Sequence, residues 1–192
     1  MNHIASFNPE YYRQSVRHWV ETLVVDLNLC PFAKRELVRD RIRFAVCEAS
    51  SEEALLEQLH QELLLLEQDD EVETTLLIHP LVLQDFSDYN DFLNLAEGLL
   101  IQMGLEGVYQ IASFHPDYQF AGTEPDDVEN YTNRTPYPLM HLIREESLER
   151  AIANYPDPDN IPQRNIELVE SMGEQKLKDM LQACLHKGVS RD

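Results

Sequence analysis

Three side chains that can do acid–base or nucleophilic chemistry stand directly before a proline in this sequence. They are the imidazoles of His79 and His115 and the thiol of Cys30. Proline pushes the preceding residue into an extended conformation and cannot donate to a strand ladder. Both histidines follow apolar runs typical of strands. We therefore expect both imidazoles at the carboxyl ends of their strands, where open α/β sheets bind ligands.

His115 is the side chain that we expect to act as the general acid and base, because a free histidine titrates near neutrality. Asp117 or Glu129 would orient its ring, and Cys30 would be the nucleophile. Structural roles stay open for the same residues. A His-Pro pair is a common way to leave a strand, and Cys30 has no reactive partner at a fixed spacing, as is typical of a small buried residue.

The irregular segment 113–141 carries most of the remaining polar candidates. It is rich in proline and in aromatic residues without being of low complexity, and long loops of that kind are usually functional. Arg134 is the first cation after a gap of ninety residues. It can pair with an acid of the segment, or it can hold the carboxylate or phosphate of a substrate in a forked contact. The further candidates for substrate binding are His79, Tyr118, Asn130, Asn133 and His141.

A metal-dependent enzyme is the second hypothesis. His79, His115 and His141, with Asp117 or Glu129, offer the nitrogen and oxygen ligands that suit zinc, iron or manganese. The sequence has no H-E-x-x-H motif and no histidine pair four residues apart. It also lacks the glycine-rich fingerprint of dinucleotide folds, a phosphate-binding P-loop and a G-x-S-x-G elbow. No cofactor is therefore predicted from a motif.

The elements that must position these residues follow an alternating order. Apolar spacing predicts an amphipathic helix over residues 9–28, which ends near Pro31. Strands are predicted at 41–47, 73–79 and 107–114, and helices lie between them. The first of these helices follows a capping box of Ser50 and Glu53, and the second begins at Ser87 or Asp88 and ends at Gly104. This β-α-β-α-β order after a leading helix predicts an α/β fold with a mostly parallel sheet.

The C-terminal part is predicted to be mainly helical. Residues 139–144 form a fourth strand, which can be antiparallel and which we expect at an edge of the sheet. Helices follow at 145–154, from Asp159 or Asn160 to Gly173, and at 174–186. The whole chain, 1–192, is interpreted as a single α/β domain with a loose tail at 1–8 and a helical appendage at 145–192.

The charge of the chain excludes several partners. The net charge is −20, and residues 44–133 contain 20 acids and no Lys or Arg. Such a surface repels nucleic acid and anionic lipid, because both bind through phosphates that a protein must neutralise. A solvated acidic face is one interpretation. The third hypothesis is a non-enzymatic interaction module that binds a basic partner through this region.

The chain has the sequence properties of a cytoplasmic protein. No apolar run is long enough to span a membrane, and the first residues do not resemble a secretory signal. The three cysteines form no C-x-x-C pair, which fits a reducing compartment. We expect a small cytoplasmic enzyme that acts on a small polar or anionic substrate.

The candidate segments also carry a family resemblance. The chain resembles the bacterial family known as domain of unknown function 1415 over roughly residues 12–175. The matching stretches are Asn28-Leu-Cys-Pro-Phe-Ala33, Thr74-Thr-Leu-Leu-Ile-His-Pro80, Asp88-Tyr-Asn-Asp-Phe-Leu93, Ser113-Phe-His-Pro-Asp-Tyr-Gln-Phe-Ala-Gly122, Glu129-Asn-Tyr-Thr-Asn-Arg134, Pro136-Tyr-Pro138 and His141-Leu-Ile-Arg-Glu145. The resemblance implies that these segments are hallmarks of the family. It implies no particular activity.

Overall fold

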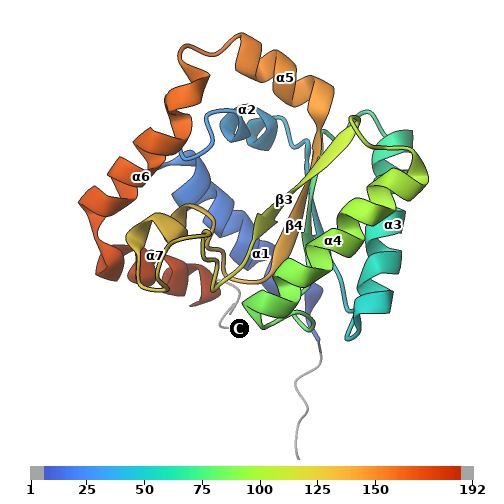
Figure 1. The fold of residues 1–192 in the computed structure, drawn as a ribbon, viewed down its shortest axis with the longest axis horizontal. Helices are drawn as coiled ribbons and strands as arrows, with labels where there is room; N and C mark the ends of the chain where they lie inside the picture. The colour runs from blue at the N-terminus through green and yellow to red at the C-terminus, as the bar shows by residue number, and fades with distance from the viewer. Residues whose placement is uncertain (1–6, 187–192) are drawn as a thin grey trace, which may run out of the picture.

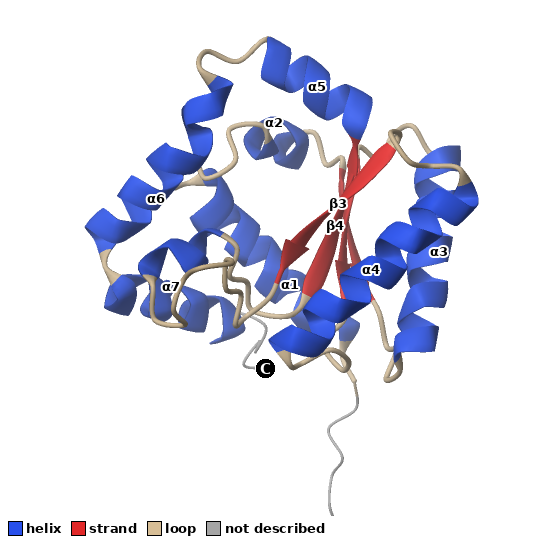
Figure 2. Ribbon diagram, in the orientation of Figure 1, coloured by secondary structure: helices blue, strands red, loops and turns tan. Residues whose placement is uncertain are grey.

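A four-stranded mixed sheet forms the centre of the molecule (Figure 2). The computed structural model describes residues 7–186. The strands are β1 (Ile42–Val46), β2 (Thr74–Ile78), β3 (Tyr109–Phe114) and β4 (Leu139–Arg144), and they lie in the order β1-β2-β4-β3. The first pair is parallel, and β4 runs antiparallel to both of its neighbours. The predicted α/β class and the antiparallel fourth strand are therefore confirmed.

The predicted place of the fourth strand was wrong. We expected β4 at an edge, but it lies between β2 and β3. Its side chains explain this position, because Leu139, Met140 and Leu142 are completely buried. Leu139 belongs to the core on one face of the sheet, and Met140 and Leu142 belong to the core on the other. A strand that must bury both faces is placed in the interior of a sheet.

Helices α3 (Glu52–Gln68) and α4 (Phe86–Met103) cover one face of the sheet (Figure 1). Ser51, rather than the predicted Ser50, caps α3 by accepting a hydrogen bond from the Ala54 amide. Asp85, rather than Ser87 or Asp88, caps α4 in the same way. Gly104 ends α4 as predicted, in the left-handed conformation that glycine adopts without strain.

The remaining helices lie on the opposite side of the sheet (Figure 1). They are α1 (Pro9–Trp19), the π-helix η1 (Val20–Val25), α2 (Ala33–Val38), α5 (Glu145–Ala153), α6 (Ile161–Met172) and α7 (Glu174–His186). Two short 3₁₀ turns, η2 (Val128–Thr132) and η3 (Pro158–Asn160), complete the chain. Helix α7 packs on α1, and α6 packs on η2. The first contact holds the C-terminal helices against the N-terminal helix, and the second holds them against the irregular segment.

The N-terminal region differs from its prediction. The single helix predicted over 9–28 is α1 followed by η1, where the hydrogen-bond pattern widens. The sequence also gave no signal for α2, a helix of one and a half turns. Of the predicted tail at 1–8, residues 1–6 lie outside the described residues. Among the helices of residues 7–186, none combines the length and the apolar character needed to cross a lipid bilayer.

Candidate functional site

The two strand-end histidines meet in a buried cluster, which we call the strand-end cluster: His79, Tyr89 and His115. His79 follows β2 and His115 follows β3, as predicted, although β4 separates the two strands. Both rings pack on Tyr89, with centroid separations of 5.8 Å for His79 and 5.1 Å for His115. All three side chains are fully buried. Tyr89 thus contacts both histidines, although their strands are separated by β4.

His115 uses both of its ring nitrogens inside the protein. Its Nε2 lies 3.1 Å from the Leu83 carbonyl, and its Nδ1 accepts a hydrogen bond of 3.0 Å from the Asp117 amide. This pattern fixes a neutral ring that donates from Nε2. Burial lowers the pKa of His115 and so favours that neutral form. Neither nitrogen is directed at a substrate, and we do not propose His115 as the acid–base group.

His79 has the same kind of environment. Its Nδ1 lies 3.1 Å from the Val82 carbonyl, and its Nε2 is buried without a hydrogen bond. Burial lowers the pKa of His79 to about 4, so its ring is neutral at physiological pH. The loop between β2 and α4 therefore closes over both histidines through the carbonyls of Val82 and Leu83.

The polar residues of the irregular segment mostly hold the segment itself. The buried side chain of Asn130 bonds to the Phe120 amide, the Thr123 hydroxyl and the Glu124 carbonyl. Arg134 donates to the carbonyls of Tyr118 and Pro125, and its guanidinium lies over the Tyr131 ring, 4.6 Å from the centroid. Within residues 7–186, Arg134 forms no ion pair with an acid. The segment is stiff because these polar groups face inward.

The other candidates of this segment divide between two places. Tyr118 packs against the rings of Phe86 and Phe120 and takes part in the same internal network. Asp117 is exposed and meets His115 through its backbone amide, not its carboxylate. Glu129 and Asn133 instead line a large cavity on the other face of the sheet.

This cavity has a volume of about 1160 Å³, which is slightly above the range of about 300–1,000 Å³ that is usual for small-molecule sites. We call it the sheet-face cavity. Its floor is made by alternate residues of the four strands, since residues two apart on a strand share one face. Those residues are Ile42, Thr74, Leu76, Ala112, Phe114, His141 and Ile143. Its walls come from α1, η1, the Cys30 loop, α2, α5 and α6. Most of the lining is apolar, and α2, α5, α6 and the irregular segment each add polar residues to it.

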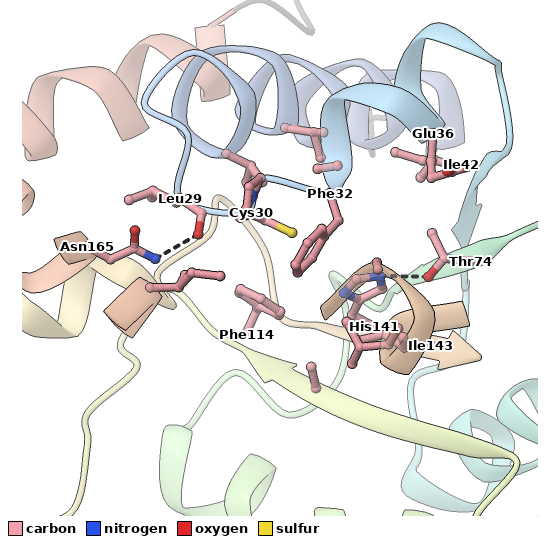
Figure 3. A pocket seen from close by; sticks show the side chains of 18 of the residues that line it. Leu29, Cys30, Phe32, Glu36, Ile42, Thr74, Phe114, His141, Ile143 and Asn165 are labelled. Carbon is pink, nitrogen blue, oxygen red and sulfur yellow. Dashed lines mark hydrogen bonds between the residues drawn. The ribbon is translucent and has the colours of Figure 1, made fainter. Parts of the chain in front are cut away.

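His141 stands at the centre of this floor. It pairs with Leu76 on one side and with Ala112 on the other, and Thr74 lies diagonally across from it on the same face. The Thr74 hydroxyl lies 2.7 Å from Nε2 of His141 and donates 2.6 Å to the Leu142 carbonyl. Because that hydroxyl proton is already used, Nε2 must be the donor and Nδ1 must carry the lone pair. Figure 3 shows this contact among the side chains that line the cavity.

His141 differs from both strand-end histidines in the surroundings of its second nitrogen. That nitrogen is hydrogen-bonded in His115 and is unpaired but fully buried in His79, whereas His141 lines the cavity. Within residues 7–186, Nδ1 of His141 has no hydrogen-bond partner. The His141 side chain is half-buried. Burial inside the cavity lowers the pKa of His141 to about 4. The ring is therefore neutral at physiological pH, with a fixed tautomer and one unused basic nitrogen.

Cys30 lies in the same cavity, on the loop between η1 and α2 (Figure 3). Asn28 adopts a left-handed conformation with a φ of 54°, which turns the chain back towards the sheet. Helix α6 then fixes the loop, because Arg164 donates to the Asn28 carbonyl and Asn165 donates to the Leu29 carbonyl. Burial raises the pKa of the Cys30 thiol, and the amides of Phe32 and Ala33 oppose that rise. Cys30 is thus held as a protonated thiol.

The predicted histidine metal centre does not form. His141 lies on the cavity face of the sheet, and its ring packs near Phe114, whereas His79 and His115 are enclosed with Tyr89. Throughout residues 7–186, no three His, Cys, Asp or Glu side chains are arranged to hold a metal ion. The hypothesis of a metal site at His79, His115 and His141 was therefore wrong.

Sequence reasoning missed two parts of this site. Thr74 was not a candidate, and only its place two residues before Leu76 marks it as a neighbour of His141 on one sheet face. The walls from α5 and α6 were also missed, because no local pattern tells which helices will fold back over a sheet. Their contribution to the cavity includes Leu148, Ala151, Ile161, Asn165 and Ile166.

The fold and the cavity together define a mixed α/β protein. Two helices pack directly on one face of its sheet, and a cavity lies between the other face and the helices that cover it. The chain belongs to the family described as "Protein of unknown function (DUF1415)", whose model matches residues 4–179. That range includes all of the strands and both sets of histidines. No curated protein and no solved structure matches the chain.

Proposed function

We propose that this protein is an enzyme that binds a small, largely apolar molecule in the sheet-face cavity and uses His141 as its acid–base group. One observation carries the proposal: a neutral imidazole with a fixed tautomer leaves Nδ1 unpaired at the floor of a cavity of about 1160 Å³. A basic nitrogen without a protein partner in such a site is available to a ligand. The proposal keeps the enzyme hypothesis and moves its acid–base group from His115 to His141.

The expected chemistry follows from the hydrogen bonds of the ring. A hydroxyl or a water molecule in the cavity gives its proton to Nδ1, and the ring becomes an imidazolium. Thr74 stabilises that cation, because its oxygen accepts a hydrogen bond from Nε2. The lowered pKa of His141 makes the ring a weak base, but it also keeps the ring unprotonated and ready at neutral pH. A bound ligand that favours the imidazolium strengthens the base.

Cys30 supplies a second reactive group to the same cavity. Its raised pKa means that the thiol becomes a nucleophile only when a base removes its proton. Two routes therefore fit the proposal. His141 activates a water molecule directly, or it deprotonates a nucleophile that then forms a covalent intermediate. The activity of a Cys30→Ser variant separates the routes, because only the covalent route needs the thiol.

Hydrolysis of 4-nitrophenyl butyrate is a suitable model reaction, because its apolar ring fits an apolar cavity. Water adds to the ester carbonyl as Nδ1 takes the water proton, 4-nitrophenolate leaves, and the ring then returns its proton. We expect His141→Gln to lower the rate at least about 100-fold, since general acid–base catalysis typically contributes that much. Glutamine keeps a donor for Thr74 but has no basic nitrogen. His60→Gln, on α3 at the other face of the sheet and outside the cavity lining, is the matched control and should keep the parent rate.

Occupation of the cavity is measured separately with N-phenyl-1-naphthylamine, a neutral dye that fluoresces in apolar sites. Ala112→Phe places a ring on the cavity floor and should weaken binding of the dye at least about tenfold. Ala153→Phe makes the same change at an exposed position of α5 and should have no effect. Equal dye binding in both variants, together with an unchanged rate in His141→Gln, would disprove the proposed function.

A further inference from the structure

The charges that line the sheet-face cavity differ from those of the rest of the chain. The whole sequence has 15 cationic and 35 acidic residues. The cavity is lined by four arginines and three glutamates, which are Arg35, Arg41, Arg144, Arg150, Glu36, Glu73 and Glu129. Charges more than about 8 Å away are largely screened at physiological salt, so the local set decides which ligand charge is favoured. The charged residues that line the cavity thus carry no negative excess.

Two of the four arginines are already fully used. Arg144 donates to the carbonyls of Leu66, Asp69 and Val72 and to the Tyr109 hydroxyl. Arg41 donates to the carbonyls of Asp70 and Glu71 and contacts two carboxylates. Both side chains hold the structure together and have little capacity left for a ligand.

The acids beside them do not make a cation site. Arg41 lies 3.7 Å from a carboxylate oxygen of Glu36 and 3.0 Å from one of Glu73. One guanidinium therefore balances much of the charge of two carboxylates, and Arg35 contacts Glu36 from the other side at 3.3 Å. A ligand ammonium would compete with both arginines for these oxygens.

Arg35 and Arg150 are the cations that can change partners. They come from α2 and α5, and each side chain is 67% exposed although it lines the cavity, which places both at its mouth. Arg35 uses only Nε, towards the carboxylate of its neighbour Glu36. Arg150 contacts Glu146 and Ser147 within one turn of its own helix. Exposed ion pairs of this kind contribute little to stability, so a ligand anion can replace them at little cost.

We propose that the ligand of the sheet-face cavity is an anionic amphiphile, with an apolar body inside the cavity and a carboxylate head group at the mouth between Arg35 and Arg150. Arginine suits that head group because its planar donors match the two oxygens of a carboxylate. The apolar body meets Trp19, Phe32, Phe114 and Tyr155. This inference rests on the proposed function, because it assigns a chemical class to the molecule that reaches His141.

The test compares three ligands that share one alkyl chain: decanoate, 1-decanol and decylamine. Each is titrated against N-phenyl-1-naphthylamine bound to the full chain at pH 7.5. We expect decanoate to displace the dye at a concentration at least about tenfold lower than 1-decanol, and decylamine to be the weakest. The preference for decanoate should shrink as sodium chloride is raised, since the contact is at an exposed mouth.

Substitutions at the mouth locate the contact. The double variant Arg35→Gln/Arg150→Gln should bring decanoate within about twofold of 1-decanol and leave 1-decanol unchanged. Arg35→Lys keeps the charge and should keep most of the preference. Lys34→Gln removes a charge from the same helix at a position that does not line the cavity, and it should change nothing. Equal displacement by decanoate and 1-decanol in the parent, or an intact preference in the double variant, would overturn the inference.

The two proposals fail in different ways. Dye that does not bind the parent chain would count against the cavity as a site and so against the proposed function. Dye that binds, and is displaced equally by 1-decanol and decanoate, would leave the cavity as a site and remove only the anionic head group. Stronger displacement by decylamine would reverse the assigned charge.

Discussion

His115 in the strand-end cluster and His141 in the sheet-face cavity use their ring nitrogens in different ways, and the unpaired nitrogen of His79 differs from that of His141 in being sealed inside the core. His115 satisfies both ring nitrogens with backbone groups, and His141 satisfies one and leaves the other facing a cavity. Burial lowers the pKa of both rings, so the pKa alone does not separate a structural histidine from a reactive one. The difference lies in the second nitrogen. In this protein, the full inventory of hydrogen bonds is a better guide to reactivity than the place of a residue at the carboxyl end of a strand.

The largest expected difference between the two regions is in stability. His115→Ala should lower the free energy of unfolding by about 3 kcal/mol, because it leaves the Leu83 carbonyl and the Asp117 amide without partners and opens a small void. His141→Gln should cost less than about 1 kcal/mol, since its contact with Thr74 is retained. Urea denaturation of both variants measures the two values.

The same two variants should also differ in their rate of hydrolysis of the model ester. We expect His115→Ala to hydrolyse the model ester at close to the parent rate under conditions where it remains folded. A stable His115→Ala protein without activity, beside an active His141→Gln protein, would reverse the roles that we assign to the two regions.

Acid should destabilise the chain through both regions. The folded pKa values of His79 and His141 are about 4, below the value near 6.5 expected for an unfolded histidine. The unfolded chain therefore binds more protons in this window, and stability rises with pH. The contribution is complete above about pH 6.5 and is lost as the pH falls towards 4, at roughly 2 kcal/mol for each ring between pH 7 and pH 5.

NMR titration of the imidazole rings measures the pKa of His79 and that of His141 separately, and so assigns this pH effect to the two regions. Decanoate should lower the apparent pKa of His141 further, because its alkyl chain excludes water from the ring, and should leave the pKa of His79 unchanged. The stability loss of a His79→Gln variant between pH 7 and pH 5 should be smaller than that of the parent. A parent protein whose stability is flat between these pH values would contradict the assignment of neutral buried rings.

The smallest expected effect concerns the tautomer of His141. Thr74→Val removes the hydroxyl that holds Nε2, so we expect the turnover of the model ester to fall about tenfold, which corresponds to the loss of one buried hydrogen bond. Thr74→Ser should restore most of the rate. Long-range ¹H–¹⁵N spectra should show the proton on Nε2 in the parent and a mixture of tautomers in Thr74→Val. An unchanged tautomer in that variant would remove Thr74 from the positioning role.

Local patterns predicted most of the elements, because they depend on residues close together in the chain. The strands at Ile42–Val46, Thr74–Ile78 and Tyr109–Phe114 fell within their predicted ranges, and Leu139–Arg144 matched its range. The caps were misplaced by one to three residues, since several Ser and Asp residues compete for the same role. Helix α2 was missed because six residues are too few to show a helical period.

The sequence by itself also determined that His79 and His115 stand directly after strands, because an apolar run precedes each and a proline follows each. It indicated that residues 113–141 form one stiff unit, and Asn130 and Arg134 show why, with their polar groups turned inward. These conclusions depend on backbone restrictions and on composition, which can be read along the chain.

Only the tertiary structure decided which histidine keeps a nitrogen for chemistry. That outcome depends on β4 entering between β2 and β3, which brings His141 beside Thr74 on the face that α5 and α6 fold over. It also depends on the loop after β2, whose Leu83 carbonyl takes the second nitrogen of His115. Contacts between residues 32 or 67 positions apart leave no periodicity in the sequence, and they alone distinguish a bonded imidazole from a free one.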